Sequence, residues 1–270
     1  PEPPNNSEMK KIHAVALAAA ALALQLPGAG AFLPQAARRV ARAGNAALAA
    51  SAIPSIPDVA ELQKADFAAS VELAEAVCGQ LRLIQVQDAK AEELDLEKLK
   101  AATVAMLSHA DGARGFFVRW LTDSYIQDKV YVFDETLPEV LTSALQEAPA
   151  DVVAPLCVMN LIMPTGMAVA YEKKWDKDAA AASAATGTRA AQIIEEMKDG
   201  AVKDACVGKM VAALNAITGT SSGEVEEDGV VFWEDFYKKW GYNPEQKEAI
   251  KNVLEDVLEL DDDDDDESSE

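Results

Sequence analysis

The sequence is poor in the residues from which most metal sites and disulfide frameworks are built. Its 270 residues include only three cysteines and two histidines, too few for a disulfide scaffold or a structural zinc site. Basic residues are also scarce, because 24 lysines and arginines stand against 46 aspartates and glutamates, giving a formal charge of −22. This charge argues against nucleic acid or anionic lipid as the main partner. No segment shows the apolar–polar alternation of a half-buried strand.

The N-terminal region has the composition of a targeting leader. Residues 1–8 precede Met9 and are interpreted as a leader remnant, and residues 9–31 join a basic start, an apolar run and small residues. These are the three parts of a secretory signal peptide, and the run is shorter than a membrane span of about 20 residues. Residues 32–57 contain three arginines, many alanines and no acidic residue, as an organelle transit peptide does.

A signal peptide followed at once by a transit peptide resembles the bipartite plastid-targeting leader of algae with red-lineage complex plastids. The resemblance is carried by Gly30-Ala31-Phe32-Leu33-Pro34, with phenylalanine at the junction and leucine where the usual pattern has alanine. It implies import into a plastid (chloroplast). Import into the lumen would need a further apolar segment, for which residues 46–52 are a poor candidate, so the stroma or the stromal face of the thylakoid is expected. A plain secreted protein with an alanine-rich linker is the alternative, against which unpaired cysteines count.

The rest of the chain predicts an all-α, soluble, multi-helix domain over residues 58–260. Apolar residues recur at helical spacing, and proline, glycine and capping residues separate the segments. Residues 261–270 are nearly all acidic and form a tail that is predicted to be disordered. The predicted helices cover 59–86, 94–108, 136–147, 152–171, 188–197, 201–217, 230–240 and 244–260.

Residues 152–171 are the most apolar segment of this domain, since none of the twenty is charged. Length and charge would admit a membrane span, but Pro155 and Pro164 favour a buried central helix with a proline kink. The methionines of this segment recur every four residues, which favours core packing, with a soft contact surface as the alternative. The small residues at 179–188 are compatible with either helix or loop.

The segment 109–120 holds the first candidate binding residues. Gly112 and Gly115 predict a turn, and His109 is the one histidine outside the predicted leader. Two arginines offer fork-shaped donors to an anion or carboxylate, and His109 is a candidate ligand for a pigment magnesium. The alternative is a tight interhelical turn whose arginines pair with local acids and whose aromatic residues are core. The candidates are His109, Arg114, Phe116, Phe117, Arg119 and Trp120.

A second aromatic cluster lies near the C-terminus, on one short predicted helix. Phe232, Phe236 and Trp240 share one face of it, and Trp233 and Tyr237 form an adjacent stripe. One stripe is expected in the core and the other against a partner, because large aromatic residues concentrate at interface centres. Burial of both stripes is the alternative. The candidate partner contacts are Trp233, Tyr237 and Trp240.

Outside these segments the sequence offers little catalytic chemistry. A nucleophilic triad would depend on His109, no Gly-x-Ser-x-Gly motif is present, and the carboxylate pairs lie in charge-rich stretches. Cys78, Cys157 and Cys206 are far apart in sequence and are expected to be free, buried thiols, with a redox pair as the alternative. No catalytic residue, metal site or cofactor is predicted, with a chlorophyll or carotenoid contact as the alternative.

These observations predict a non-catalytic, plastid-imported accessory protein that binds a thylakoid photosynthetic complex. The expected role is a peripheral photosystem or antenna subunit, or a linker, which does not span the membrane. Segments 109–123, 160–171 and 240–250 resemble soluble helical proteins of cyanobacteria and plastids to which no chemistry is attached. A stromal assembly factor or chaperone-like binder is the first alternative, and an enzyme or pigment-binding protein using residues 109–119 is the second.

Overall fold

A computed structural model describes residues 53–87, 89–122, 136–220 and 227–259 of the chain. Of this part, 81% is helical and none is strand, which confirms the all-α prediction. The predicted signal peptide, most of the predicted transit peptide and the acidic tail lie outside the described residues. The elements are α3 (Val59–Leu62), α4 (Phe67–Gln85), the 3-10 turn η2 (Ala89–Glu93), α5 (Leu96–Leu107), α6 (Ala110–Thr122), α7 (Glu139–Glu147), α8 (Ala150–Lys173), α9 (Lys177–Glu196), α10 (Ala201–Thr218), α11 (Glu227–Lys239) and α12 (Pro244–Val257).

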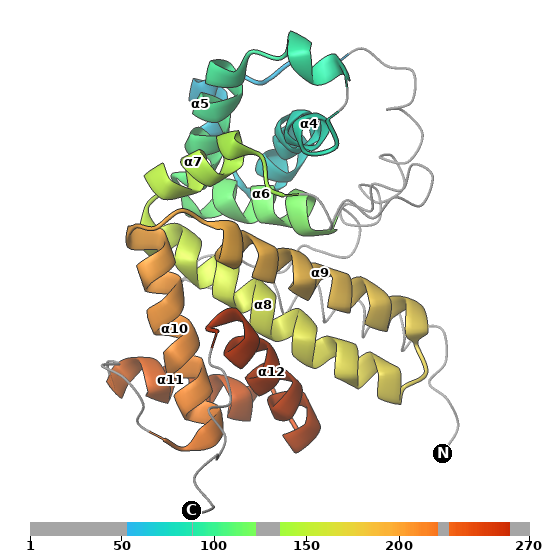
Figure 1. The fold of residues 1–270 in the computed structure, drawn as a ribbon, viewed down its shortest axis with the longest axis vertical. Coiled ribbons are helices and arrows are strands. Elements are labelled where there is room, and N and C mark those ends of the chain that lie inside the picture. The colour runs from blue at the N-terminus through green and yellow to red at the C-terminus, as the bar shows by residue number, and fades with distance from the viewer. Residues whose placement is uncertain (1–52, 88, 123–135, 221–226, 260–270) are drawn as a thin grey trace, which may run out of the picture.

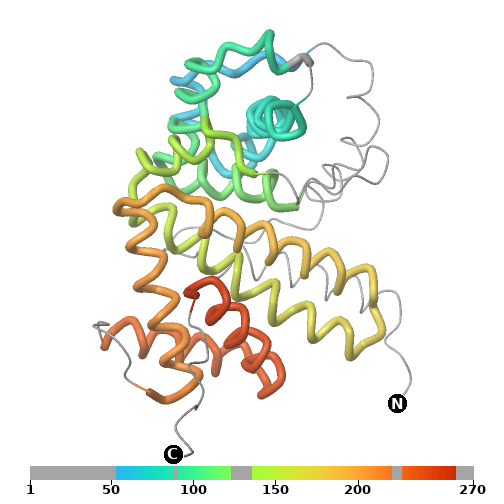
Figure 2. The backbone as a smooth tube through the Cα atoms, in the orientation of Figure 1, coloured from blue at the N-terminus to red at the C-terminus, as the bar shows by residue number. Residues whose placement is uncertain are grey.

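Helix α8 is the centre of the fold and joins its two halves. It packs against α9, α10 and α12, and also against α6 of the N-terminal half. Figure 1 shows α4–α7 at one end of the molecule and α10–α12 at the other, with the paired α8 and α9 between them. In the tube of Figure 2, α8 and α9 form a long hairpin whose connecting turn lies at an edge of the molecule.

The apolar character of α8 is explained by this central position. Among the described residues it is the one helix long and apolar enough to cross a membrane, and 56% of its most apolar window is buried inside the protein. Val153, Leu161 and Ile162 are fully buried in the main core. Pro155 and Pro164 lie within the helix without ending it. The predicted buried central helix is therefore confirmed.

Aspartates begin several helices, so part of the negative charge has a structural use. The carboxylates of Asp58, Asp66, Asp95 and Asp176 accept hydrogen bonds of 2.8, 2.9, 3.0 and 3.1 Å from backbone N–H groups in the first turns of α3, α4, α5 and α9. Such a cap satisfies a donor that has no partner within its helix. The cap at Asp66 also divides the single helix predicted over 59–86, because α4 begins anew behind it.

The last helix begins as its sequence predicts and is tied directly to α8. Asn243 and Gln246 form a reciprocal capping box, with bonds of 3.0 and 3.1 Å between side chain and backbone N–H. Pro244 occupies the first helical position, where its missing N–H costs nothing. The Gln246 side chain also donates from Nε2 to the Gly166 carbonyl at 2.9 Å. Helix α12 is thereby fixed against the middle of α8.

The small residues at 179–188 are helical and allow α9 to lie close to α8. A Cβ at Gly187 would fall 3.2 Å from Thr165 Oγ1, so a larger residue there would be crowded. The far end of the hairpin has a small core of its own, separate from the main one. This small core contains Met167, Tyr171, Ala179 and Ala180. Residues 167–180, named the hairpin arm below, therefore extend beyond the main core.

Candidate functional site

The first candidate segment is a continuous helix, so the predicted turn at Gly112 and Gly115 is wrong. Both glycines lie inside α6, where they permit close packing rather than an unusual backbone angle. A Cβ at residue 112 would fall 2.3 Å from the Met106 carbonyl oxygen, and one at residue 115 would fall 2.6 Å from Ser70 of α4. The two glycines are therefore contact points between packed segments.

His109 immediately precedes α6 and uses both ring nitrogens within the fold. Its Nδ1 accepts a hydrogen bond from the Gly112 N–H at 3.2 Å, which leaves Nε2 to donate to the Leu62 carbonyl at 3.0 Å. The first bond caps the N-terminus of α6, and the second ties α6 to α3. A magnesium ion bound at His109 would have to replace one of these two bonds.

The two candidate arginines hold helices together. The guanidinium of Arg114 lies 3.5 Å from the Asp111 carboxylate, and its carbon is 4.6 Å from the centroid of the Phe67 ring. Burial lowers the pKa of Arg114, and the neighbouring Asp111 opposes that shift. Arg119 is 2% exposed and pairs with Glu75 of α4. This arrangement matches the alternative of arginines paired with local acids.

Two further arginines, which no sequence pattern indicates, cap the C-terminal end of α6. Arg82 of α4 donates from Nη2 to the Trp120 carbonyl at 2.7 Å, and Arg189 of α9 donates from Nη1 to the Leu121 carbonyl at 2.6 Å. Cations at a helix C-terminus stabilise it through its last carbonyls and the helix dipole. Because both arginines come from other helices, no local spacing in the sequence indicates this role.

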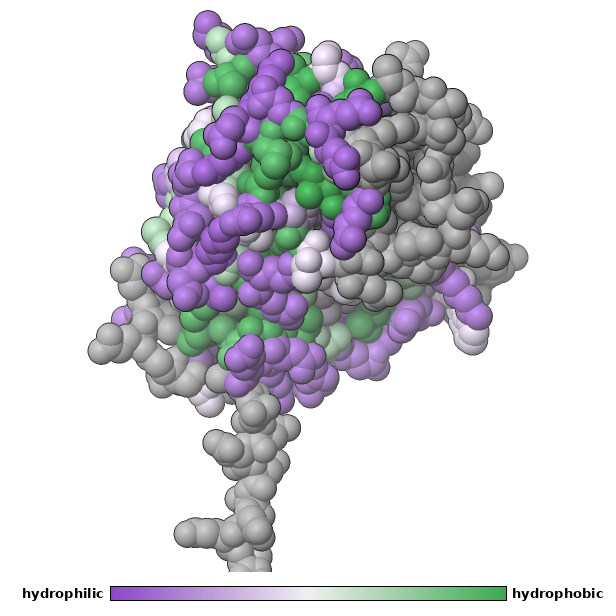
Figure 3. All heavy atoms as spheres, turned by 45° about the horizontal axis from the view of Figure 1, so that its top comes forward, coloured by the Kyte–Doolittle hydropathy of each residue, from purple (hydrophilic) through white to green (hydrophobic). Residues whose placement is uncertain are grey.

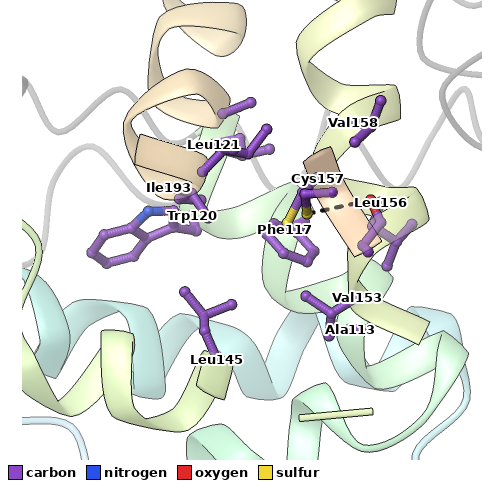
Figure 4. Packing of buried hydrophobic residues seen from close by; sticks show 14 of the residues in the cluster. Ala113, Phe117, Trp120, Leu121, Leu145, Val153, Leu156, Cys157, Val158 and Ile193 are labelled. Atoms are coloured by element: carbon purple, nitrogen blue, oxygen red, sulfur yellow. Dashed lines mark hydrogen bonds between the residues drawn. The ribbon is translucent and has the colours of Figure 1, made fainter. Parts of the chain in front are cut away.

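The aromatic residues of the first segment belong to the core. Phe116, Phe117 and Trp120 are 0%, 2% and 4% exposed. Figure 4 shows Phe117 beside Cys157 of α8, and Trp120 among core side chains of α7 and α9. These rings hold α6 against α8 and α9 and present no surface to a partner.

Most of the second aromatic cluster is buried, including Phe236 of the other stripe, which is 6% exposed. Trp233 and Tyr237 are 4% and 1% exposed, and the Tyr237 hydroxyl donates to the Ala213 carbonyl of α10 at 3.4 Å. Burial raises the pKa of both Tyr237 and Tyr242 well above the usual value. Trp240 is half-buried. The stripe predicted as a possible partner contact at Trp233 and Tyr237 is therefore the stripe that faces α10.

The exposed part of this cluster is Phe232 with its neighbour Val231. Their exposed fractions are 52% and 48%, and the Phe232 ring stacks on buried Phe236 with centroids 6.4 Å apart. This stacking holds Phe232 in place on the surface of α11. The surrounding acidic side chains on the same helix are all exposed: Glu227, Asp228, Glu234 and Asp235. Val231, Phe232 and these four acids are named the α11 patch.

Another exposed aromatic residue lies at the tip of the hairpin arm. Trp175, between α8 and α9, is 84% exposed, more than any other large hydrophobic residue that the structure describes. Its backbone has φ of 60°, in the left-handed region. On the face shown in Figure 3, hydrophilic residues surround smaller hydrophobic areas. A single tryptophan in a charged turn has no periodicity, so the sequence pattern gives no signal for it.

The three cysteines are buried and form no disulfide bond, and Cys157 and Cys206 are neighbours. A hydrogen bond between Cys157 of α8 and Cys206 of α10, together with burial, raises the pKa of the Cys157 thiol well above its usual value. A raised pKa keeps a thiol protonated and unreactive. Within the described ranges, no group of three or more histidine, cysteine, aspartate or glutamate side chains is placed to hold a metal ion.

Residues 70–257 match the family described as "uncharacterised conserved protein UCP020893". The chain belongs to this family. The matched range begins within α4 and ends with α12, so in this chain it spans the helices packed around α8, together with the α11 patch and the hairpin arm. The predicted leader and the acidic tail lie outside the matched range. Neither the curated proteins nor the solved structures contain a match to the chain.

Proposed function

We propose that the chain is a plastid-imported, non-catalytic accessory protein that binds a thylakoid photosynthetic complex through the α11 patch. The observation that carries the proposal is the exposure of Phe232 and Val231 beside four acidic side chains. Large rigid side chains of this kind serve as anchors at interfaces. The resemblance of residues 9–57 to a plastid-targeting leader supports the compartment, and with it the thylakoid as the place of binding.

The α11 patch also indicates the chemistry of its partner. An apolar pair ringed by acids is complementary to an apolar pocket with lysines and arginines at its rim. The formal charge of −22 on the chain would steer it toward such a basic surface, and this steering weakens as salt screens it. We propose a peripheral photosystem or antenna subunit, or a linker between them, as the role that fits these properties.

The proposal is tested by locating the chain among native complexes. Source cells are fractionated, thylakoid complexes are separated on a mild-detergent gradient, and the chain is quantified by mass spectrometry. Co-migration with a photosystem or antenna complex at near one-to-one stoichiometry is expected. Recovery at low stoichiometry with assembly intermediates would indicate the stromal assembly factor instead, and recovery in the soluble stroma alone would contradict thylakoid binding.

A matched pair of variants then tests whether the α11 patch is the docking surface. Phe232→Ser should weaken rebinding of the purified chain to washed thylakoids by about tenfold or more, because it removes the central anchor of the α11 patch. Leu96→Ser is the control, since Leu96 is 49% exposed but lies on α5. Equal rebinding of the two variants would show that the α11 patch is not the docking surface.

A further inference from the structure

The tip of the hairpin arm combines an exposed tryptophan with lysines. Trp175 is 84% exposed, and the neighbouring Lys173, Lys174 and Lys177 are exposed as well. Lys173 pairs with Glu245 in the first turn of α12, so the base of the tip is braced against the body. A residue other than glycine at positive φ is held at an energetic cost, yet Trp175 gains little burial in return. Packing within the chain therefore does not explain this side chain.

The helices behind the tip are free of charge over a long stretch. In α8 no charged residue lies between Asp151 and Glu172, and in α9 none lies between Asp178 and Arg189. The side chains of residues 167–170 are only half-buried, which leaves apolar surface of α8 partly open close to the tip. These two uncharged stretches, on either side of the charged tip, contrast with the acidic composition of the whole chain.

We propose that the tip of the hairpin arm, residues 172–178, inserts Trp175 into the headgroup region of a lipid bilayer that has no net surface charge. Tryptophan is enriched at membrane–water interfaces, where its ring contacts apolar groups and its N–H stays near water. Lys174 and Lys177, which are exposed beside it, can extend their methylene stems along the apolar surface and place their ammonium groups at the lipid phosphates. The remainder of the chain stays in water.

The charges of the tip favour lipid as its binding partner over a pocket of another protein and over a second copy of the chain. Residues 172–178 contain three lysines and three acidic residues, and thus no net charge, within a chain of net charge −22. Zwitterionic headgroups present both signs of charge in the same way and attract neither sign in excess. A protein pocket around Trp175 would have to desolvate several lysines and acids, residue types that are depleted from interface cores. A second copy of the chain would bring a second large negative charge into contact.

The test uses the full chain with unilamellar vesicles of phosphatidylcholine. The chain has four tryptophans, so the emission of Trp175 is obtained as the difference between the wild-type spectrum and that of Trp175→Ser. In lipid excess this difference emission should shift to shorter wavelength and become protected from acrylamide. Co-sedimentation with vesicles should fall about tenfold in Trp175→Ser and be retained in Leu96→Ser, because one large buried side chain supplies an effect of that size. Anionic lipid should not be required for binding.

Three results would overturn the proposal. The first is an unshifted difference emission in lipid excess, or equal sedimentation of wild type and Trp175→Ser. The second is concentration-dependent self-association that Trp175→Ser abolishes in the absence of lipid binding, which would make a second copy the occupant. The third is retention of wild type, but not of Trp175→Ser, on purified complexes without binding to vesicles, which would indicate a protein pocket. Phe232→Ser should still bind vesicles, so failure of the proposed docking through the α11 patch would be recognised separately.

Discussion

Gly115 of α6 lies directly against the backbone of Ser70 in α4. A Cβ at residue 115 would fall 2.6 Å from both the carbonyl carbon and the Cβ of Ser70, and 2.8 Å from the backbone nitrogen of Val71. Ser70 itself is completely buried. The two helices thus touch backbone to backbone at this point, and the spacing between α4 and α6 depends on the missing side chain.

The Gly115→Ala variant should be less stable than wild type by about 1–3 kcal/mol, because the added methyl group overpacks this contact. Helix propensity alone would predict the opposite, since alanine is the better helix former by about 1 kcal/mol. The control is Gly79→Ala in α4, where an added Cβ meets nothing within 4 Å and a gain in stability is expected. Urea denaturation followed by circular dichroism measures both. Equal stability of the two variants would refute the close contact.

The role of His109 can be separated into its cap and its tie to α3. His109→Ala removes both hydrogen bonds and should lower the free energy of unfolding by about 1–2 kcal/mol. His109→Asn offers a capping oxygen to α6 but no donor that reaches Leu62, so an intermediate loss is expected. Pigment content of the purified chain is measured in parallel. A loss of bound pigment in His109→Ala with unchanged stability would favour the ligand role over the structural one.

Glu195 at the end of α9 makes stability depend on pH. Burial raises the pKa of its carboxyl above the usual value of 4.5, and the neighbouring Glu196, Asp256 and Glu259 raise it further. The folded state therefore binds the proton more tightly than the unfolded state does. This contribution to stability is fully present below pH 4.5 and is lost as the pH rises through the raised pKa.

Glu195→Gln should accordingly have a higher Tm than wild type at pH 7, because the charge that is costly in the folded state is gone. The difference should shrink as the pH falls toward 4.5, where the wild-type carboxyl is protonated too. Added salt should reduce the share that comes from repulsion by neighbouring acids. The control is Glu72→Gln at an exposed position of α4, for which an unchanged Tm is expected at both pH values. A wild-type Tm at pH 7 that equals or exceeds that of Glu195→Gln would contradict the predicted direction of the change in Tm.

The sequence predicts most of the helices correctly, but it does not predict the contacts between them. Hydrophobic spacing and local caps predict the all-α class, the buried α8 and the start of α12, because these depend on residues close together in the chain. The glycines of α6 show the limit, since spacing alone does not distinguish a turn from a close packing point. The deciding neighbour of Gly115 is Ser70, which lies in a different helix.

The same limit applies to the candidate binding residues. The sequence correctly places two aromatic stripes on α11, but which stripe meets α10 is decided by tertiary packing. Trp233, Phe236 and Tyr237 are buried against the core, which leaves Phe232 exposed. No sequence pattern predicts the exposure of Trp175, because a protruding turn is recognised only when the two helices that carry it are known.

Helix α8 is also covered by α12, the last helix along the part of the chain that the structure describes. A polypeptide that leaves a ribosome N-terminus first presents residues 152–171 long before residues 244–257 exist to pack against them. Until α12 is made, the part of α8 that it covers, around Gly166, is open to lipid and to other nascent chains. A chain truncated before Asn243 would keep that part of α8 exposed, so α12 shields the most apolar helix of the fold from aggregation.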